Sequence, residues 1–169
     1  MFLLLGDYRL TTWKLPSKME ADKVAQSSLK GSLRLGESSC YQECYYAIRI
    51  CHHITEDVFC IVLFSETGEM PSLLSIDKDK IAIGYNRNIA LFNFCTNKLL
   101  FEKELYGTFF FAKHVDSKLI VITEVGFVTF DMNGEVLKSV DTDLVTAFEF
   151  YSDSVILHTE SGDVKTDMS

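Results

Sequence analysis

Ser117–Val128, with the sequence SKLIVITEVGFV, is the stretch that decides the fold of this 169-residue chain. It joins a β-branched apolar run to an acidic turn that contains Gly126, and a second apolar run follows the turn. The same pattern returns about 36 positions later in Ser154–Val164, which reads SVILHTESGDV, and about 38 positions earlier in Asp79–Asn93. Short apolar runs that are split by turns and repeat at this period indicate small sheet units that pack on one another.

The region after residue 70 supplies a regular series of strand candidates. Several runs, such as Leu119–Ile122, are apolar at consecutive positions, which predicts sheets that are covered on both faces. The turns are rich in Asp, Asn and Gly, and Asn133-Gly134 is the strongest two-residue hairpin signal. The predicted strands group into two complete units and a third that is one strand short: Leu73–Ile76, Lys80–Gly84, Ile89–Phe94 and Lys98–Leu105; Thr108–His114, Leu119–Thr123, Phe127–Met132 and Glu135–Val140; Val145–Tyr151, Val155–Thr159 and Asp163–Asp167.

Two hairpins, around Glu124–Val128 and Glu160–Val164, carry a family resemblance. Together with the apolar runs before them, they resemble the second-to-third strand hairpin of Trp-Asp-repeat and quinoprotein-like β-propeller blades. The Gly-His and Trp-Asp dipeptides of true Trp-Asp repeats are absent, and the sole tryptophan, Trp13, lies outside the repeats. The resemblance covers residues 45–169. It implies a mainly β protein of antiparallel four-stranded units arranged as a partial β-propeller, with a β-sandwich as the alternative.

The N-terminal region is expected to hold strands and the only helix. Phe2–Leu5 and Tyr8–Leu15 have strand character. Ser17 is followed three residues later by Glu20, which is a capping-box pattern. It predicts a short helix that begins after Ser17 and ends near Gly31, where glycine favours a helix stop.

The chain is expected to form a single domain over residues 1–169. Residues 1–44 would hold the N-terminal strand, the short helix and a loop over 32–44, and residues 45–169 the β units. Tyr45–Cys51 and Val58–Ser65 would form a first, partial unit. Since the last unit lacks its outer strand, two arrangements are open. Either the N-terminal strand completes that unit, or the array remains an open arc, which we favour.

Composition limits the classes of function. The formal net charge is −8 and the sequence pI is near 4.9. An acidic surface repels phosphate backbones, so nucleic-acid binding is not expected, and a basic protein partner is favoured. The apolar run at Met1–Leu5 is too short for a membrane span or a signal peptide, so we expect a cytoplasmic protein without membrane association.

Cysteine and histidine residues gather between residues 40 and 60, where a zinc site would need paired ligands. Zinc sites prefer regularly spaced thiolate and imidazole pairs, and the spacing here is irregular. We interpret these residues as buried free thiols and strand-end histidines, and expect neither metal nor cofactor. The residues considered are Cys40, Cys44, Cys51, His52, His53 and Cys60.

No pattern identifies a reaction. His114 and His158 are isolated in the sequence, and a catalytic histidine needs a nucleophile or an orienting carboxylate within reach. No phosphate-binding glycine loop or serine elbow is present. The chain is therefore expected not to be an enzyme.

Acidic turn residues recur with the repeats and are the candidate contact residues. If the turns share one face, their carboxylates would hold a basic partner there. Aromatic and arginine residues near the unit boundaries would serve as anchors. The candidate partner-binding residues are Asp77, Asp79, Glu124, Glu160 and Asp163, with Tyr85, Arg87 and Tyr106 as anchors.

The expected function is that of a non-enzymatic, cytosolic protein-binding module. In size, charge and composition the chain resembles the immunity proteins of bacterial toxin systems. That resemblance implies binding and blockade of a cognate basic toxin of the nuclease type. The alternative is a scaffold fragment of a larger propeller-containing assembly, in which two arcs close as a homodimer.

Overall fold

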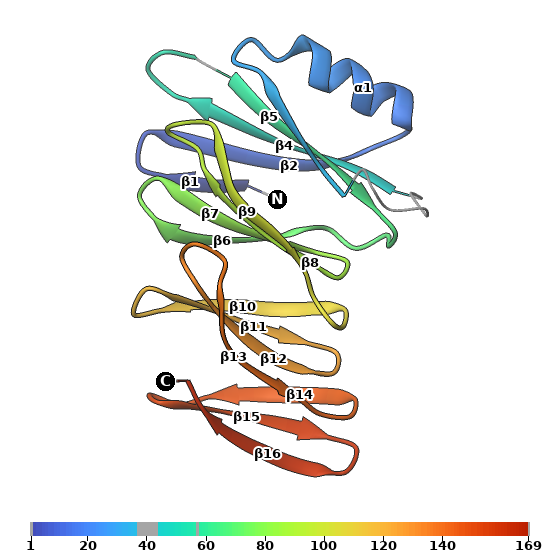
Figure 1. The fold of residues 1–169 in the computed structure, drawn as a ribbon. Helices are drawn as coiled ribbons and strands as arrows, with labels where there is room; N and C mark the ends of the chain where they lie inside the picture. The colour runs from blue at the N-terminus through green and yellow to red at the C-terminus, as the bar shows by residue number, and fades with distance from the viewer. Residues whose placement is uncertain (1, 37–43, 57, 169) are drawn as a thin grey trace.

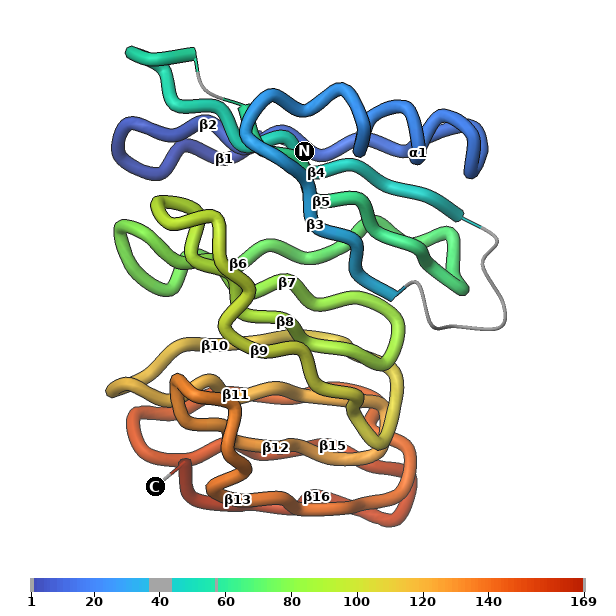
Figure 2. The backbone as a smooth tube through the Cα atoms, turned by 45° about the horizontal axis from the view of Figure 1, so that its top comes forward, coloured from blue at the N-terminus to red at the C-terminus, as the bar shows by residue number. Residues whose placement is uncertain are grey.

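The computed structural model describes residues 2–36, 44–56 and 58–168. These residues form one helix and four mainly antiparallel sheets, and the sheets follow one another in a stack from the N-terminal sheet at one end to the C-terminal sheet at the other (Figure 1). The helix lies on the outer face of the first sheet, as the turned view in Figure 2 also shows.

The second, third and fourth sheets are the repeats that the sequence predicts. Each is a meander in which consecutive strands are neighbours, and the third and fourth differ only by one strand. The second sheet contains β6 (Ser72–Asp77), β7 (Lys80–Tyr85), β8 (Asn88–Asn93) and β9 (Lys98–Glu104). The third contains β10 (Phe109–Val115), β11 (Lys118–Thr123), β12 (Gly126–Asp131) and β13 (Val136–Asp141), and the fourth β14 (Val145–Phe150), β15 (Ser154–Thr159) and β16 (Gly162–Asp167).

The first sheet has a different topology, with five strands in the order β1-β2-β4-β5-β3. The helix α1 connects β2 to the far edge of the sheet, where β3 pairs with β5 in parallel. Ser17 caps this helix, because its hydroxyl accepts the Glu20 backbone N–H at 3.3 Å. The elements are β1 (Phe2–Leu5), β2 (Tyr8–Leu15), α1 (Lys18–Ser27), β3 (Ser32–Leu35), β4 (Cys44–His52) and β5 (Val58–Ser65).

Alternate residues of the central strands enter different cores. In β11, Leu119 and Val121 pack toward the second sheet, whereas Ile120 and Ile122 pack toward the fourth. All four are fully buried, and burying such a side chain contributes about 1.5–3 kcal/mol. The continuous apolar run is thus explained by sheets on both sides of β11, which confirms the prediction made from the sequence.

The repeats are also joined by a recurring set of backbone hydrogen bonds at the junctions between sheets. At each junction, N–H groups of the connecting segment donate to carbonyls of the hairpin turn in the sheet before it. Between the second and third sheets these are Leu105 to Arg87 (2.6 Å) and Phe109 to Asn86 (2.6 Å). Between the third and fourth they are Thr142 to Val125 (2.9 Å) and Val145 to Glu124 (2.8 Å).

Of the two arrangements left open by the sequence, the structure has the favoured one: the N-terminal strand β1 pairs with β2 in the first sheet and does not complete the fourth sheet. Three details differ from the sequence expectation. The strands over 45–65 belong to the first sheet, and the repeats begin only at Ser72. Part of the expected loop, Ser32–Leu35, is a strand, because its parallel partner β5 satisfies its backbone. The helix ends at Ser27, before Gly31, and the hydroxyls of Ser27 and Ser28 donate to the Val24 carbonyl.

Two glycines at equivalent positions test the difference between the third sheet, in which β13 pairs with β12, and the fourth sheet, in which no strand of the described residues pairs with the outer edge of β16. Gly126 and Gly162 both have positive φ (142° and 128°), but a Cβ on Gly126 would lie 2.0 Å from the Val140 carbonyl oxygen of β13. A Cβ on Gly162 would meet nothing within 4 Å, because the fourth sheet has no such strand. We expect Gly162→Ala to cost about 1–3 kcal/mol of unfolding free energy from backbone strain alone. Gly126→Ala should cost about 1–3 kcal/mol more through the added clash, measured by urea denaturation.

Gly68→Ala is the matched control, because that glycine has open space and no positive φ is recorded for it. It should change the unfolding free energy by less than about 0.5 kcal/mol. Equal losses for Gly126→Ala and Gly162→Ala would contradict the assigned difference between the third and fourth sheets.

Candidate functional site

The hairpin turns of the repeats lie on two opposite rims of the stack, because successive turns of a meander alternate between the two ends of the strands (Figure 1). We call one of them the junction rim, since it carries the hydrogen-bonded junctions between sheets. It comprises residues 85–88, 104–108, 123–126, 141–145 and 159–163. The opposite rim comprises residues 77–80, 93–98, 115–118, 131–136 and 150–154.

Charge is distributed unequally between these rims. The junction rim carries six carboxylates and one cationic side chain, Arg87. Its acidic residues are Glu104, Glu124, Asp141, Asp143, Glu160 and Asp163. The opposite rim contains four lysines among its carboxylates, at positions 78, 80, 98 and 118. The junction rim is therefore the more uniformly acidic of the two.

The structure separates the candidate residues that the sequence placed on one face. Asp77 and Asp79 lie on the opposite rim, away from Glu124 and Glu160, because the β6–β7 and β11–β12 turns are at different ends of their sheets. Both aspartates also have local partners: Asp77 accepts from Lys80 Nζ at 3.2 Å, and Asp79 from Asn93 Nδ2 at 2.8 Å. The expectation that all the acidic turns share one face is therefore wrong for Asp77 and Asp79.

Tyr85 is at the junction rim but is buried, with 4% of its surface exposed. Its hydroxyl donates a short hydrogen bond to the Glu102 carboxylate. Burial, followed by this carboxylate, raises the pKa of the Tyr85 phenol well above its usual range. The side chain packs in the core between the first and second sheets and is not part of the exposed surface.

The remaining candidates of the junction rim differ in accessibility. Tyr106 projects from the β9–β10 connection with 85% of its surface exposed. Arg87 is exposed but pairs with Glu104 at 3.0 Å. Glu124 is half-buried and accepts the Thr108 hydroxyl at 2.8 Å, which fixes its carboxylate beside the rim.

Glu160 is exposed in the β15–β16 turn, and Asp163 belongs to a carboxylate group that includes two residues the sequence analysis missed, Asp141 and Asp143. A shallow hollow of about 550 Å³ lies between the β13–β14 connection and the β15–β16 turn, and Asp141, Asp143 and Asp163 line it. The Ser161 hydroxyl and backbone N–H both donate to Asp143, and these bonds lower the pKa of its carboxyl. The signal in the sequence was the Asp-x-Asp spacing at the end of β13, but only the fold places it beside Asp163.

His158 lies on the outer face of the fourth sheet between two carboxylates. Its Nδ1 is 2.8 Å from Asp163 Oδ1, and its Nε2 is 3.6 Å from Glu149 Oε1. The Asp163 carboxylate, and then that of Glu149, raise the pKa of the imidazole above its ordinary value. No sequence pattern indicated these partners, because strand pairing brings Glu149 of β14 beside His158 of β15.

Of the cysteine and histidine residues considered for zinc, Cys44, Cys51 and His52 lie on β4, His53 lies in the turn after it, and Cys60 lies on β5. Cys40 lies outside the described residues, while Cys44 and His52 mark opposite ends of β4. Cys51 and His52, being consecutive, point to opposite faces of the sheet. In residues 2–36, 44–56 and 58–168, no three His, Cys, Asp or Glu side chains are grouped as metal ligands.

The described part of the chain also contains no helix with the length and apolar character needed to cross a membrane. This finding is consistent with the lengths of the elements, since α1 has ten residues.

Comparison with solved structures supports a propeller-like architecture. BamB from Moraxella catarrhalis, a quinoprotein-like β-propeller, superposes with a TM-score of 0.51 at 14% sequence identity. The match covers 72% of this chain and 39% of the Moraxella protein. The fold is propeller-like. The stacked sheets correspond to blades of an open arc, which confirms the partial propeller predicted from the repeats.

A protein of unknown function from Bacteroides caccae is also similar, with a TM-score of 0.45, 13% identity, and coverage of 73% of this chain and 59% of that one. No protein-family model and no curated protein sequence matches this chain. The matched region is less than two thirds of the length of each of these two solved structures.

The environment of His158 gives a prediction about pH. Because its pKa is raised in the folded chain, the stabilisation from protonated His158 is fully present below the ordinary pKa, near pH 6.5, and is lost as pH rises through the folded value. An NMR titration of the histidine ring protons should report a pKa above about 6.5 for His158. Asp163→Asn should lower it clearly, and Glu149→Gln less, since that carboxylate is farther away. A larger effect of Glu149→Gln would contradict this assignment.

Proposed function

We propose that the protein is a binding module whose junction rim holds a basic surface of another protein. The observation that supports this most directly is the composition of that rim: six carboxylates against one arginine, which itself pairs with Glu104. Carboxylates arranged on one side of a molecule speed encounter with a cationic partner and discriminate against acidic ones. The exposed ring of Tyr106 supplies an aromatic anchor of the kind enriched at protein interfaces.

The order of the rim favours binding, because little conformational freedom remains to be lost. Backbone hydrogen bonds connect the turn at Asn86 and Arg87 to the segment at Leu105 and Phe109, and the next junction repeats them. Glu124 and Asp143 are each held by a hydroxyl, from Thr108 and Ser161. A partner would therefore meet carboxylates that already have fixed positions, and ordering them costs less free energy on association.

The more specific proposal is an immunity protein that blocks a basic toxin of the nuclease type in the cytosol. Carboxylates spaced along a rim would occupy the cationic groups with which such a toxin binds the phosphates of its substrate. This role needs no catalysis by the chain itself. Its support is the acidic rim, the net charge of −8 and a propeller-like scaffold that presents turns to a partner.

Site-specific crosslinking tests which rim binds. Tyr106 on the junction rim and Tyr151 on the opposite rim are both exposed, at 85% and 48%. Replacing each in turn with the photoreactive amino acid p-benzoylphenylalanine should give a covalent adduct with one basic protein in cells for position 106 only. The adduct is identified by mass spectrometry. Adducts from position 151 alone, or with an acidic protein, would refute the proposal.

The affinity for that crosslinked protein should depend on the rim carboxylates. The variant Asp141→Asn/Glu160→Gln removes two exposed charges of the junction rim, and Asp116→Asn/Glu135→Gln removes two exposed charges of the opposite rim. Both change the net charge equally. Calorimetry at low salt should show about tenfold weaker binding for the first pair, since each exposed ion pair contributes about 0.2–1 kcal/mol. If both double variants weakened binding equally, the loss of affinity would result from the net charge alone, and the junction rim would not be the binding surface.

Inhibition distinguishes the specific proposal from the general one. If the partner is a nuclease, its activity on DNA or RNA should fall in proportion to the amount of this protein bound. If the partner has no nuclease activity, the result would contradict the immunity role but would still support the proposal of a binding module. A homodimer that resists high salt in light scattering, with no other partner crosslinked, would favour the scaffold alternative instead.

A further inference from the structure

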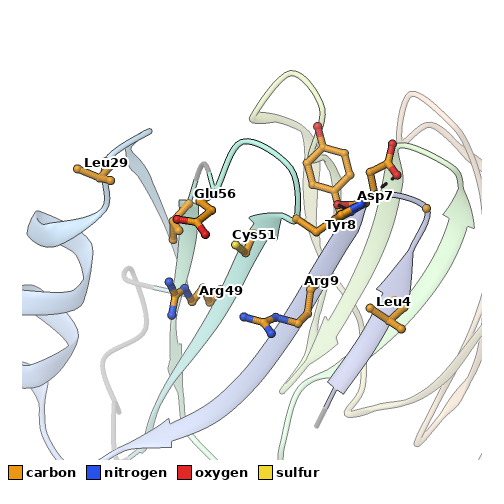
Figure 3. A pocket seen from close by; sticks show the side chains of 11 residues that line it. Leu4, Asp7, Tyr8, Arg9, Leu29, Arg49, Cys51 and Glu56 are labelled. Atoms are coloured by element: carbon orange, nitrogen blue, oxygen red, sulfur yellow. Dashed lines mark hydrogen bonds and ion pairs between the residues drawn. The ribbon is translucent and has the colours of Figure 1, made fainter.

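The outer face of the first sheet is only partly covered by α1, and a hollow of about 630 Å³ lies over the part that the helix leaves open. It is far from the junction rim, at the end of the stack that holds the N-terminus (Figure 1). Its floor consists of side chains of β2 and β4, and the β1–β2 and β4–β5 turns form one wall. Figure 3 shows this face with Arg9 and Arg49 on it.

The two arginines of the floor are neighbours across the strand pair. Arg9 is opposite Cys51 in the β2–β4 register, and Arg49 is opposite Thr11, so the arginines are diagonal neighbours on the same face. Side chains in this relation are separated by about 7–8 Å at the backbone, within reach of long residues. Both arginines are exposed and extend over the same hollow.

These arginines differ from the other two of the chain. Arg34 pairs with Asp22 at 2.9 Å, and Arg87 pairs with Glu104 at 3.0 Å. Neither Arg9 nor Arg49 makes an ion pair or a hydrogen bond with any residue in 2–36, 44–56 or 58–168. In a chain of net charge −8, two adjacent guanidinium groups that have no carboxylate partner among the described residues are an unusual arrangement. Their mutual repulsion would be relieved by an anion bound between them.

The other charged groups of the hollow stand at its wall. Asp7 faces His53, with 3.7 Å between Oδ1 and Nδ1, and Glu56 belongs to the β4–β5 turn. The cationic groups thus occupy the floor and the acidic groups the turns. Guanidinium forks are well suited to phosphate oxygens, which they bind in a bidentate manner.

Apolar surface adjoins the two arginines. Leu4 and Leu29 line the hollow with 64% and 85% of their surfaces exposed. An adjoining hollow of about 270 Å³ extends beneath the end of α1, is lined by Trp13, Val24 and Cys60, and shares Arg49 and Leu29 with the first. Sites for small molecules combine this kind of apolar lining with a few polar groups, within roughly 300–1,000 Å³.

We propose that this hollow binds a phosphate monoester with an apolar substituent, the phosphate between Arg9 and Arg49 and the substituent on the Leu29 side, toward the adjoining hollow beneath α1. Two guanidinium groups match the double negative charge of the phosphate. The site is separate from the junction rim and does not depend on the function proposed for it.

Titration of the isotope-labelled full-length protein with hexyl phosphate, followed by NMR, tests the proposal. Saturable shifts are expected for amides of the floor and wall, such as Gly6, Arg9 and Cys51. Hexanoate, with a single charge, and inorganic phosphate, without an apolar part, should each bind several-fold more weakly. Hexylammonium should not bind. Equal binding of hexylammonium, or the absence of saturable shifts with hexyl phosphate, would overturn the proposal.

Two double variants separate the site from net charge. Arg9→Gln/Arg49→Gln should raise the Kd for hexyl phosphate at least tenfold, whereas Arg34→Gln/Arg87→Gln removes the same charge elsewhere and should leave it within twofold. Arg9→Lys/Arg49→Lys keeps the charge without the fork and should give an intermediate Kd. The amide spectrum of each variant verifies the fold. Equal Kd values for the two Gln variants would show that the arginines are not the site.

Discussion

The structure depends on sheets that bury both of their faces against neighbouring layers. Residues of β11 and of β8 alternate between two cores, so each central sheet connects the core before it to the core after it. Removing one sheet would expose apolar surface on two others, and the folded state of the stack is therefore cooperative along its length. The junction hydrogen bonds add geometric precision, because they fix each turn against the next connecting segment.

The outer faces of the first and fourth sheets differ in what covers them. At the N-terminal end, α1 covers part of the first sheet through Ala21 and Ala25, which pack on Ala47, Val62 and Phe64. At the C-terminal end, the fourth sheet buries Val155 and Leu157 inward and presents Ile156 and His158 outward. The junction rim and the hollow beside α1 are two separate surfaces of this stack.

Much of the repeat region could be predicted from the sequence, whereas the assembly of the first sheet could not. The runs around Leu119 and Val155, with the acidic turns after them, are local signals that specify strands and hairpins. The pairing of Ser32–Leu35 with β5 is a long-range parallel contact, and a segment of four residues gives no local sign of its partner. For the candidate sites, Tyr106 and Glu160 lie on the exposed junction rim, but Asp77 and Asp79 lie on the other rim, because the sequence period does not show at which end of a strand a turn lies.

The sequence by itself determined the strands and hairpins of the repeats and the repeat length, because these follow from apolar periodicity and turn chemistry within about 10 residues. Only the tertiary structure decided which residues share a surface. Asp143 and Asp163 line one hollow, and Arg9 stands beside Arg49, through strand pairing and sheet stacking. Such contacts join positions far apart in the chain, and the free energy that selects them is burial summed over whole sheets, which no short stretch of sequence contains.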